Sequence, residues 1–246
     1  MHGGATRGER LRLDAVVPAL DEERNLAALA ARLLRASDPG DRVERLIVAD
    51  GGSTDRTREI AAECGATVVA SARGRGVQLA AGARAASGDV LVFLHADALP
   101  ESGALARVRE HLRDAACTWG AFEQRIDAEG WFYRCVERAA NARVRRGMVY
   151  GDSGLVVRRE LYERAGGFRE MPLFEDVELS QRLRRLAPAR LFGGARLAIS
   201  ARRWQRHGAL RVTLRNWMLR LAYGAGVEAA TLARFYPSHR ERGPAR

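Results

Sequence analysis

Residues 90–97 read Val-Leu-Val-Phe-Leu-His-Ala-Asp, and this stretch decides the fold class. Five apolar residues in succession are typical of a strand buried on both faces, as in a parallel sheet covered by helices. The polar residues His95 and Asp97 follow at once, at the end of the strand where sheets of this kind bind ligands. The sequence therefore predicts an α/β domain with a candidate site beyond this strand.

The segments before residue 90 alternate between short apolar runs and helical patterns. We expect strands at residues 11–17, 46–49 and 67–70, and helices at residues 21–35, 54–64 and 77–86. Asp21 is a plausible cap for the first helix. Such alternation predicts a Rossmann-like, mostly parallel sheet with helices on both faces. The polar clusters that follow residues 49, 70 and 94 should then meet in one crevice.

The second half of the chain is less regular. We expect strands at residues 118–126 and 154–158, and helices at residues 131–145, 175–186 and 208–227, the last one amphipathic. The predicted organisation is a main domain at residues 11–207, a helical extension packed on it at residues 208–236, and flexible ends at residues 1–10 and 237–246.

Composition and charge bound the class of protein. The chain has 246 residues, of which 47% are hydrophobic and 29% charged, as in globular proteins. Its net charge of +11 suits a nucleic-acid or anionic-membrane partner, but all basic residues are arginine, which also suits codon bias in a GC-rich genome.

Cysteine usage and apolar run length indicate the compartment. The three cysteines form no Cys-x-x-Cys pair, which argues against a disulfide framework or a zinc site. We find no signal-peptide pattern and no apolar run long enough for a membrane span. A cytoplasmic location is therefore expected.

Two clusters at predicted strand ends could bind a nucleotide and a metal. Asp50 opens the turn Asp50-Gly51-Gly52-Ser53, whose glycines permit close approach of a ligand and whose carboxylate can accept hydrogen bonds from a base or ribose. Asp97 is an oxygen ligand of the kind that Mg²⁺ or Mn²⁺ prefers. The alternatives are a plain strand-to-helix turn for Asp50 and a helix cap for Asp97.

Two later clusters could act on the substrate. Glu175 and Asp176 open a predicted helix, where a carboxylate could remove a proton from a hydroxyl or simply interact with the helix dipole. Residues 202–207 read Arg-Arg-Trp-Gln-Arg-His, which could neutralise a diphosphate and stack a sugar on Trp204, or form an exposed basic loop.

Taken in order, these motifs resemble those of family-2 glycosyltransferases with the GT-A fold. The resemblance covers about residues 11–207 and rests on Pro18-x-x-Asp21-Glu22, on residues 47–55 (Ile-Val-Ala-Asp-Gly-Gly-Ser-Thr-Asp), on residues 73–82, on Phe93-Leu94-His95-Ala96-Asp97, and on Glu175-Asp176. Residues 119–122, 151–153, 172–180 and 202–208 are in addition similar to a bacterial set labelled arsenosugar-biosynthesis glycosyltransferases.

The resemblance implies a role for each matching residue. It places the nucleotide against Pro18, Glu22, Asp50, Arg75, Gln78 and His95. It places Mg²⁺ or Mn²⁺ on Asp97, with His207 nearby, and it makes Asp176 the catalytic base with Glu175 beside it. The acceptor is expected against Trp204, Arg203, Trp119 and Asp152.

The chain departs from the family pattern at three positions. Gly51 stands where a second Asp is usual, and His95 replaces the first Asp of Asp-x-Asp, which leaves Asp97 as the main metal ligand. Ser200 stands where processive synthases have Gln, which favours a single transfer.

The resemblance implies an inverting, metal-dependent transfer of one sugar from a nucleotide-sugar, a UDP-sugar by family pattern, to an acceptor hydroxyl. An alternative enzyme is a nucleotidyltransferase that uses Gly74-Arg75-Gly76 as a phosphate loop. A third hypothesis is a basic nucleic-acid or membrane-surface binding protein. A combined hypothesis is an enzyme whose helix at residues 211–223 lies on the inner face of the membrane. Its acceptor would be lipid-linked or apolar, and it would have no nucleic-acid partner.

Overall fold

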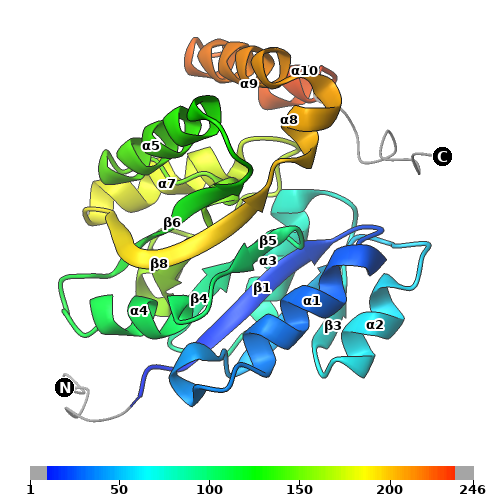
Figure 1. Cartoon of the computed structure of the whole chain (residues 1–246), viewed down its shortest axis with the longest axis vertical. Helices are drawn as coiled ribbons and strands as arrows, with labels where there is room; N and C mark the ends of the chain where they lie inside the picture. Colours follow the sequence, from blue (N-terminus) through cyan, green and yellow to red (C-terminus); the bar gives the residue numbers. More distant parts are fainter. Residues whose placement is uncertain (1–9, 236–246) are drawn as a thin grey trace.

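The computed structural model describes residues 10–235, with the backbone alone at positions 203, 206, 207 and 209–212. The predicted flexible ends lie outside this range, except for Arg10. Within it, one sheet has the strand order β3-β2-β1-β4-β7-β6-β8-β5 (Figure 1). The strands are β1 (Leu13–Ala19), β2 (Arg45–Asp50), β3 (Thr67–Ala70), β4 (Val90–Phe93), β5 (Ala98–Pro100), β6 (Trp119–Asp127), β7 (Leu155–Arg158) and β8 (Arg190–Ser200).

The sheet is mostly parallel, as predicted. Strands β3, β2, β1 and β4 pair in parallel, β7 runs antiparallel to both β4 and β6, and β6 pairs in parallel with β8. The short β5 pairs antiparallel with the far end of β8. The carboxyl ends of β1, β2 and β4 therefore lie along one edge of the sheet, where ligands bind in such folds.

Ten α-helices and two short 3-10 turns accompany the sheet within the described residues. They are α1 (Glu23–Leu34), η1 (Pro39–Asp41), α2 (Thr57–Glu63), α3 (Arg75–Ala85), α4 (Ala104–His111), α5 (Trp131–Arg145), η2 (Gly151–Ser153), α6 (Arg159–Arg164), α7 (Glu175–Leu186), α8 (Arg202–His207), α9 (Ala209–Gly224) and α10 (Ala229–Ala233).

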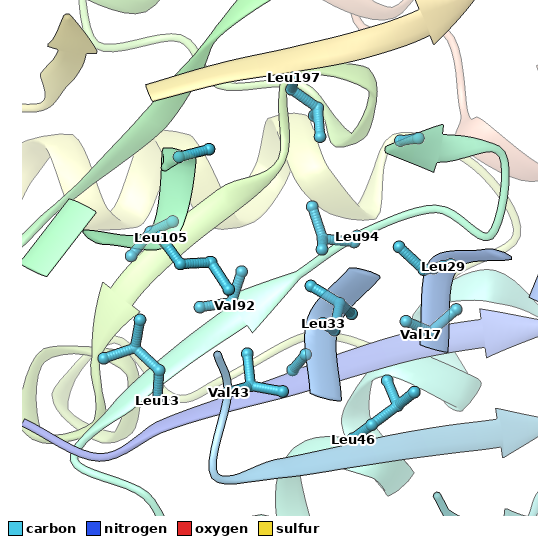
Figure 2. Close-up of a cluster of buried hydrophobic side chains, with 14 of the residues drawn as sticks. Leu13, Val17, Leu29, Leu33, Val43, Leu46, Val92, Leu94, Leu105 and Leu197 are labelled. Carbon is cyan, nitrogen blue, oxygen red and sulfur yellow. The ribbon is translucent and has the colours of Figure 1, made fainter. Parts of the chain in front are cut away.

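Two hydrophobic clusters cover the two faces of the sheet. Helices α1, α2 and α4 pack on one face, where Leu29, Leu33 and Leu105 meet Val17 and Val92 (Figure 2). Helices α3, α5, α6 and α7 pack on the other face. Residues of the central strands alternate between the two clusters, because successive side chains of a strand point to opposite faces.

The start of α1 differs from the prediction. Its N-cap residue is Glu22, and Asp21 does not cap it. Asp21 instead has a positive φ of 55°, and its carboxylate accepts a hydrogen bond of 2.8 Å from the Thr54 backbone N–H. Asp21 therefore joins the loop after β1 to the loop after β2, which brings these two strand ends together.

Helices α9 and α10 pack against the loop that precedes α7. A third hydrophobic cluster contains Leu173 and Phe174 from that loop, Leu219 from α9 and Leu232 from α10. In Figure 1 these helices lie at one end of the molecule, beyond α5 and α7. No helix in residues 10–235 combines the length and the apolar character that crossing a membrane requires.

Candidate active site

A small cavity opens at the carboxyl ends of β1 and β4. It is narrow: the centre of a water molecule can occupy about 20 Å³ of it, within about 300 Å³ of empty space that includes open solvent. Five residues singled out from the sequence line it, namely Pro18, Arg75, His95, Glu175 and Asp176. They come from four separate segments of the chain, so the sheet and α7 bring together the predicted nucleotide side and the predicted base.

Asp176 lies half-buried in the first turn of α7 and faces the end of β4. Its Oδ2 accepts a 2.5 Å hydrogen bond from the Gly151 backbone N–H, and its Oδ1 accepts one of 2.7 Å from Val177 N–H. These two donors hold the carboxylate in one orientation. A carboxylate that is fixed and still reachable from the cavity has the geometry of a general base.

Gly151 is a site residue whose role the sequence did not reveal. A Cβ at this position would lie 2.6 Å from His95 Nε2 and 3.2 Å from Asp176 Oδ2. Any larger residue would therefore push His95 and Asp176 apart. The chain allows the close approach of β4, η2 and α7 only because residue 151 has no side chain.

Glu175 is buried deeper than its neighbour, with 1% of its surface exposed. Its Oε1 pairs with Nε of Arg75, the first residue of α3, whereas its Oε2 has no hydrogen-bond partner among the described residues. Burial raises the pKa of this carboxyl, which the charge of Arg75 opposes and that of Asp176 reinforces. Glu175 thus joins α3 to α7 across the cavity.

Phe174 precedes this pair and has a left-handed backbone with a φ of 65°. Such a conformation is costly for a bulky residue and persists where the surroundings hold it. The ring stacks on Tyr223 of α9 with the centroids 4.6 Å apart. Packing by the C-terminal helices therefore holds the backbone turn that presents Glu175 and Asp176.

His95 lies half-buried between groups of opposite charge. Burial lowers its pKa to about 4, and the nearby Arg75 acts in the same direction, against Asp97, Asp176 and Asp152. The imidazole is therefore neutral at pH 7, with one ring nitrogen that donates and one that accepts a hydrogen bond.

Asp97, two residues after His95, is exposed. It fits a metal site in which the protein supplies only one or two ligands. No three His, Cys, Asp or Glu side chains of the described residues converge as a closed metal site. Mg²⁺, in particular, often takes one or two carboxylates and completes its shell with water and phosphate oxygens. The side chains of His207 and Arg203 are outside the described set.

A cationic cluster adjoins the cavity on the side of η2. Arg143 Nη2 lies 3.2 Å from Asp152 Oδ1, and the guanidinium groups of Arg143 and Arg220 lie 3.7 Å and 4.3 Å from the centroid of the Tyr150 ring. Burial alone would raise the pKa of Asp152, but Arg143 and Arg220 outweigh it, and the pKa is lowered. Asp152 is therefore a carboxylate at neutral pH.

The sequence did not single out Arg143, Tyr150 or Arg220. The one hint in the sequence was the position of Tyr150, directly before residues 151–153, which resemble the bacterial glycosyltransferase set. Arg143 and Arg220 are two of many arginines, and only the packing of α5 and α9 brings both of them to Tyr150.

Three side chains that were predicted to bind the nucleotide make hydrogen bonds to neighbouring groups of the protein. Asp50 accepts hydrogen bonds from the backbone N–H groups of Gly52 and Ser53, and Glu22 accepts one from Asn25. Gln78 Nε2 donates to the Ala19 carbonyl at the end of β1 and to the Ala49 carbonyl near the end of β2, at 2.7 Å and 2.9 Å. These side chains shape the strand ends, and their direct contact with a nucleotide stays a prediction.

The two predicted tryptophans differ in position. Trp119 is completely buried in the core and donates its indole N–H to the Ala187 carbonyl at 2.8 Å. A ring enclosed in this way has no face for an acceptor, so the acceptor-binding prediction for Trp119 is wrong. Trp204 is half-buried and lies edge-on to Tyr133, with the centroids 6.3 Å apart.

Comparison with known proteins gives one family. The model of Glycosyl transferase family 2 matches residues 14–168, which is more than half of the chain. No curated protein matches the chain.

Solved structures share the fold at low sequence identity. A mannosyltransferase from Pyrobaculum calidifontis, in complex with GDP-Man and Mn²⁺, has a TM-score of 0.64 and 19% identity over 87% of this chain and 62% of that one. TarS 1-349 from S. aureus has a TM-score of 0.63 and 15% identity over 78% and 61%.

Glucosyl-3-phosphoglycerate synthase from Mycobacterium tuberculosis, in complex with Mn²⁺, UDP and glucosyl-3-phosphoglycerate, has a TM-score of 0.50 and 22% identity over 77% and 70%. The chain spans about three fifths of the length of the first two of these structures.

The sheet order, the cavity at the strand ends and the family match agree, and this chain belongs to Glycosyl transferase family 2, with the GT-A fold.

Proposed function

We propose that this chain is an inverting, metal-dependent glycosyltransferase that moves one sugar from a nucleotide-sugar to an acceptor hydroxyl without polymerising it. One observation carries the proposal. Asp176 is fixed by Gly151 N–H in a cavity that also holds Pro18, Arg75 and His95. A candidate base thus faces the residues that the family pattern assigns to the nucleotide.

The transfer forms one bond and breaks another at the anomeric carbon. The oxygen of the acceptor hydroxyl bonds to this carbon as the bond from the carbon to the diphosphate oxygen breaks, and the proton of the hydroxyl passes to Asp176. The diphosphate departs with the electron pair. Attack on the side opposite the leaving group inverts the configuration, and a single base is sufficient for it.

The nucleotide side combines a cation, a neutral imidazole and an exposed carboxylate. Arg75 and His95 border the cavity, and Asp97 is the residue that would hold Mg²⁺ or Mn²⁺. When bound, the metal supplies positive charge that offsets the charge of the departing diphosphate. The solved complexes with GDP-Man or UDP and Mn²⁺ support this assignment, and we favour a UDP-sugar.

The acceptor side of the proposal keeps Asp152, Trp204 and Arg203 and adds Arg220. Among described residues, Arg220 contacts the Tyr150 ring and has no carboxylate within ion-pairing distance. It can therefore offer its donors to an anionic group of the acceptor. We propose a lipid-linked acceptor, and hence an enzyme of the cytoplasm that contacts the inner face of the membrane.

The nucleotidyltransferase alternative is weaker. A Cβ at Gly76 would lie 2.5 Å from the Arg169 carbonyl, and Arg75 pairs with Glu175. The glycine therefore permits close packing of α3 on the loop before α7, which explains the Gly-Arg-Gly segment without a triphosphate.

Thermal stabilisation tests the donor assignment. UDP, GDP and their sugar conjugates are added with Mn²⁺ or EDTA to the wild type and to Asp97→Ala. The Asp97 side chain is exposed, so its removal leaves the fold intact. We expect one nucleotide to stabilise the wild type only with Mn²⁺, and Asp97→Ala to lose this shift. No shift with any nucleotide would contradict the proposal.

Turnover of Asp176→Asn tests the base. Its amide oxygen can still accept from Gly151 N–H, so we expect normal nucleotide binding and a rate lower by about 10²- to 10⁴-fold. Near-wild-type turnover in the folded variant would rule Asp176 out as the base.

A further inference from the structure

Helix α9 exposes a continuous apolar stripe to solvent. Leu214, Trp217, Met218 and Leu221 have 57%, 58%, 60% and 65% of their surface exposed. Their spacing of three, four and seven residues places them on one side of the helix. We call these four residues the α9 stripe. A group of large apolar residues on one exposed face of a protein typically marks an interaction surface.

The opposite side of α9 is the one that packs on the protein. Leu219 is buried with Leu173 and Phe174, and Tyr223 stacks on Phe174. Other residues of the same helix therefore make its contacts with the protein, and the α9 stripe has no part in this packing. Beyond α9, Val227 and Phe235 add exposed apolar surface at 40% and 68%.

The positive charge of the chain is concentrated in the same region. Residues 201–246 contain ten arginines and only two acidic residues, Glu228 and Glu241, so this segment carries a net +8 out of the +11 of the whole chain. The eleven residues after Phe235 are mostly polar and include three of these arginines. Their composition adds positive charge and few large apolar side chains.

We propose that the α9 stripe docks on an anionic lipid membrane, with α9 lying in the plane of the interface. Apolar side chains with a tryptophan on one face, together with many arginines, are the composition of helices that bind such surfaces. A second copy of the chain is a poorer occupant, because both copies carry the same excess of arginines and like charges repel.

Docking would place the active site beside the lipid. The inner side of α9 reaches the site through Arg220, which lies on Tyr150, and through Tyr223, which holds Phe174 ahead of Asp176. A lipid-linked acceptor would then approach the cavity along the surface of the membrane. This consequence rests on the proposed sugar transfer, whereas the docking of α9 would hold whatever reaction the site performs.

Vesicle flotation tests the docking. The full chain is mixed with vesicles of phosphatidylcholine alone or with 30% phosphatidylglycerol, at low and at high salt. We expect flotation with the anionic vesicles only, weakened by salt. Trp217→Ser/Leu221→Ser should reduce binding at least tenfold, because two apolar side chains lose their contact with the lipid.

Trp131→Ser/Leu99→Ser is the matched control, since Trp131 and Leu99 are exposed at 79% and 39% and lie on α5 and β5. It should bind vesicles like the wild type. Equal binding to both vesicle types, no binding, or unchanged binding by the Trp217/Leu221 variant would overturn the proposal, as would a dimer in solution that the same substitutions dissociate. Nucleotide-induced stabilisation, measured on each variant, reports separately on the proposed function.

Discussion

Replacing Arg75 by methionine removes the cation that faces the buried carboxylate of Glu175. Glu175 is 1% exposed, and its Oε2 has no partner among the described residues, so the variant would leave a buried charge without compensation. Breaking a buried ion pair in this way costs about 3–5 kcal/mol. Because the Arg75 side chain is 31% exposed, solvent screens part of the loss, and we expect about 3 kcal/mol.

The loss should depend on pH in a defined direction. Burial already raises the pKa of Glu175, and removal of the guanidinium raises it further. The native state of the variant then holds a proton that the unfolded state releases above a pH of about 4.3. Stability of the variant relative to the wild type therefore falls as the pH rises, and the deficit should be larger at pH 8 than at pH 5.

Urea unfolding at these two pH values measures the effect. The set consists of the wild type, Arg75→Met, Glu175→Gln and the double variant. The double variant has no buried charge, so it should recover most of the stability at pH 8 but not the turnover, because Arg75 also borders the cavity. The reasoning is refuted if Arg75→Met unfolds like the wild type at pH 8, or if the double variant is no more stable than Arg75→Met.

Three further substitutions test other parts of the site. Gly151→Ala should lower turnover by about 10²-fold with little change in melting temperature, because a Cβ 2.6 Å from His95 Nε2 and 3.2 Å from Asp176 Oδ2 displaces both side chains. Gly193→Ala, where a Cβ meets nothing within 4 Å and φ is not positive, controls for the general cost of replacing a glycine. Trp119→Ala should lower the free energy of unfolding by about 3–5 kcal/mol, measured with urea, since Trp119 is a core residue; a change in the KM for the acceptor alone would contradict this. Tyr223→Ala should lower kcat more than it lowers nucleotide affinity, because Phe174 loses its stacking partner. The comparison is Tyr133→Ala, which removes the ring beside Trp204. An equal effect of both substitutions on kcat would argue against a specific role of Tyr223.

Long apolar or amphipathic patterns were sufficient to predict much of the fold. The residues of β3, α5 and α7 coincide with the predicted segments, and β1, β2 and β4 differ from them by one or two residues at the ends. Their apolar residues repeat with the period of the element, and the two faces of the sheet require that period.

The sequence did not predict β8, β5 or α4. Strand β8 contains Gly193-Gly194, and its pairing with β6 is irregular between Phe122 and Glu123, so its alternation of apolar and polar residues is broken. Strand β5 has only three residues and is held by β8. Elements of this kind depend on their partners more than on their own pattern.

The sequence by itself determined the α/β alternation and the polar residues at the strand ends, because burial on both sides of a sheet demands apolar runs and leaves polar groups at their ends. Only the tertiary structure decided what each side chain does there. Trp119 is buried in the core, and Asp50 accepts a hydrogen bond from a backbone N–H of its own loop. Because Gly151 has no side chain, His95 and Asp176 can both lie close to it. It also decided which side of α9 packs and which faces solvent, since both sides carry apolar residues and only the position of the neighbouring elements distinguishes them.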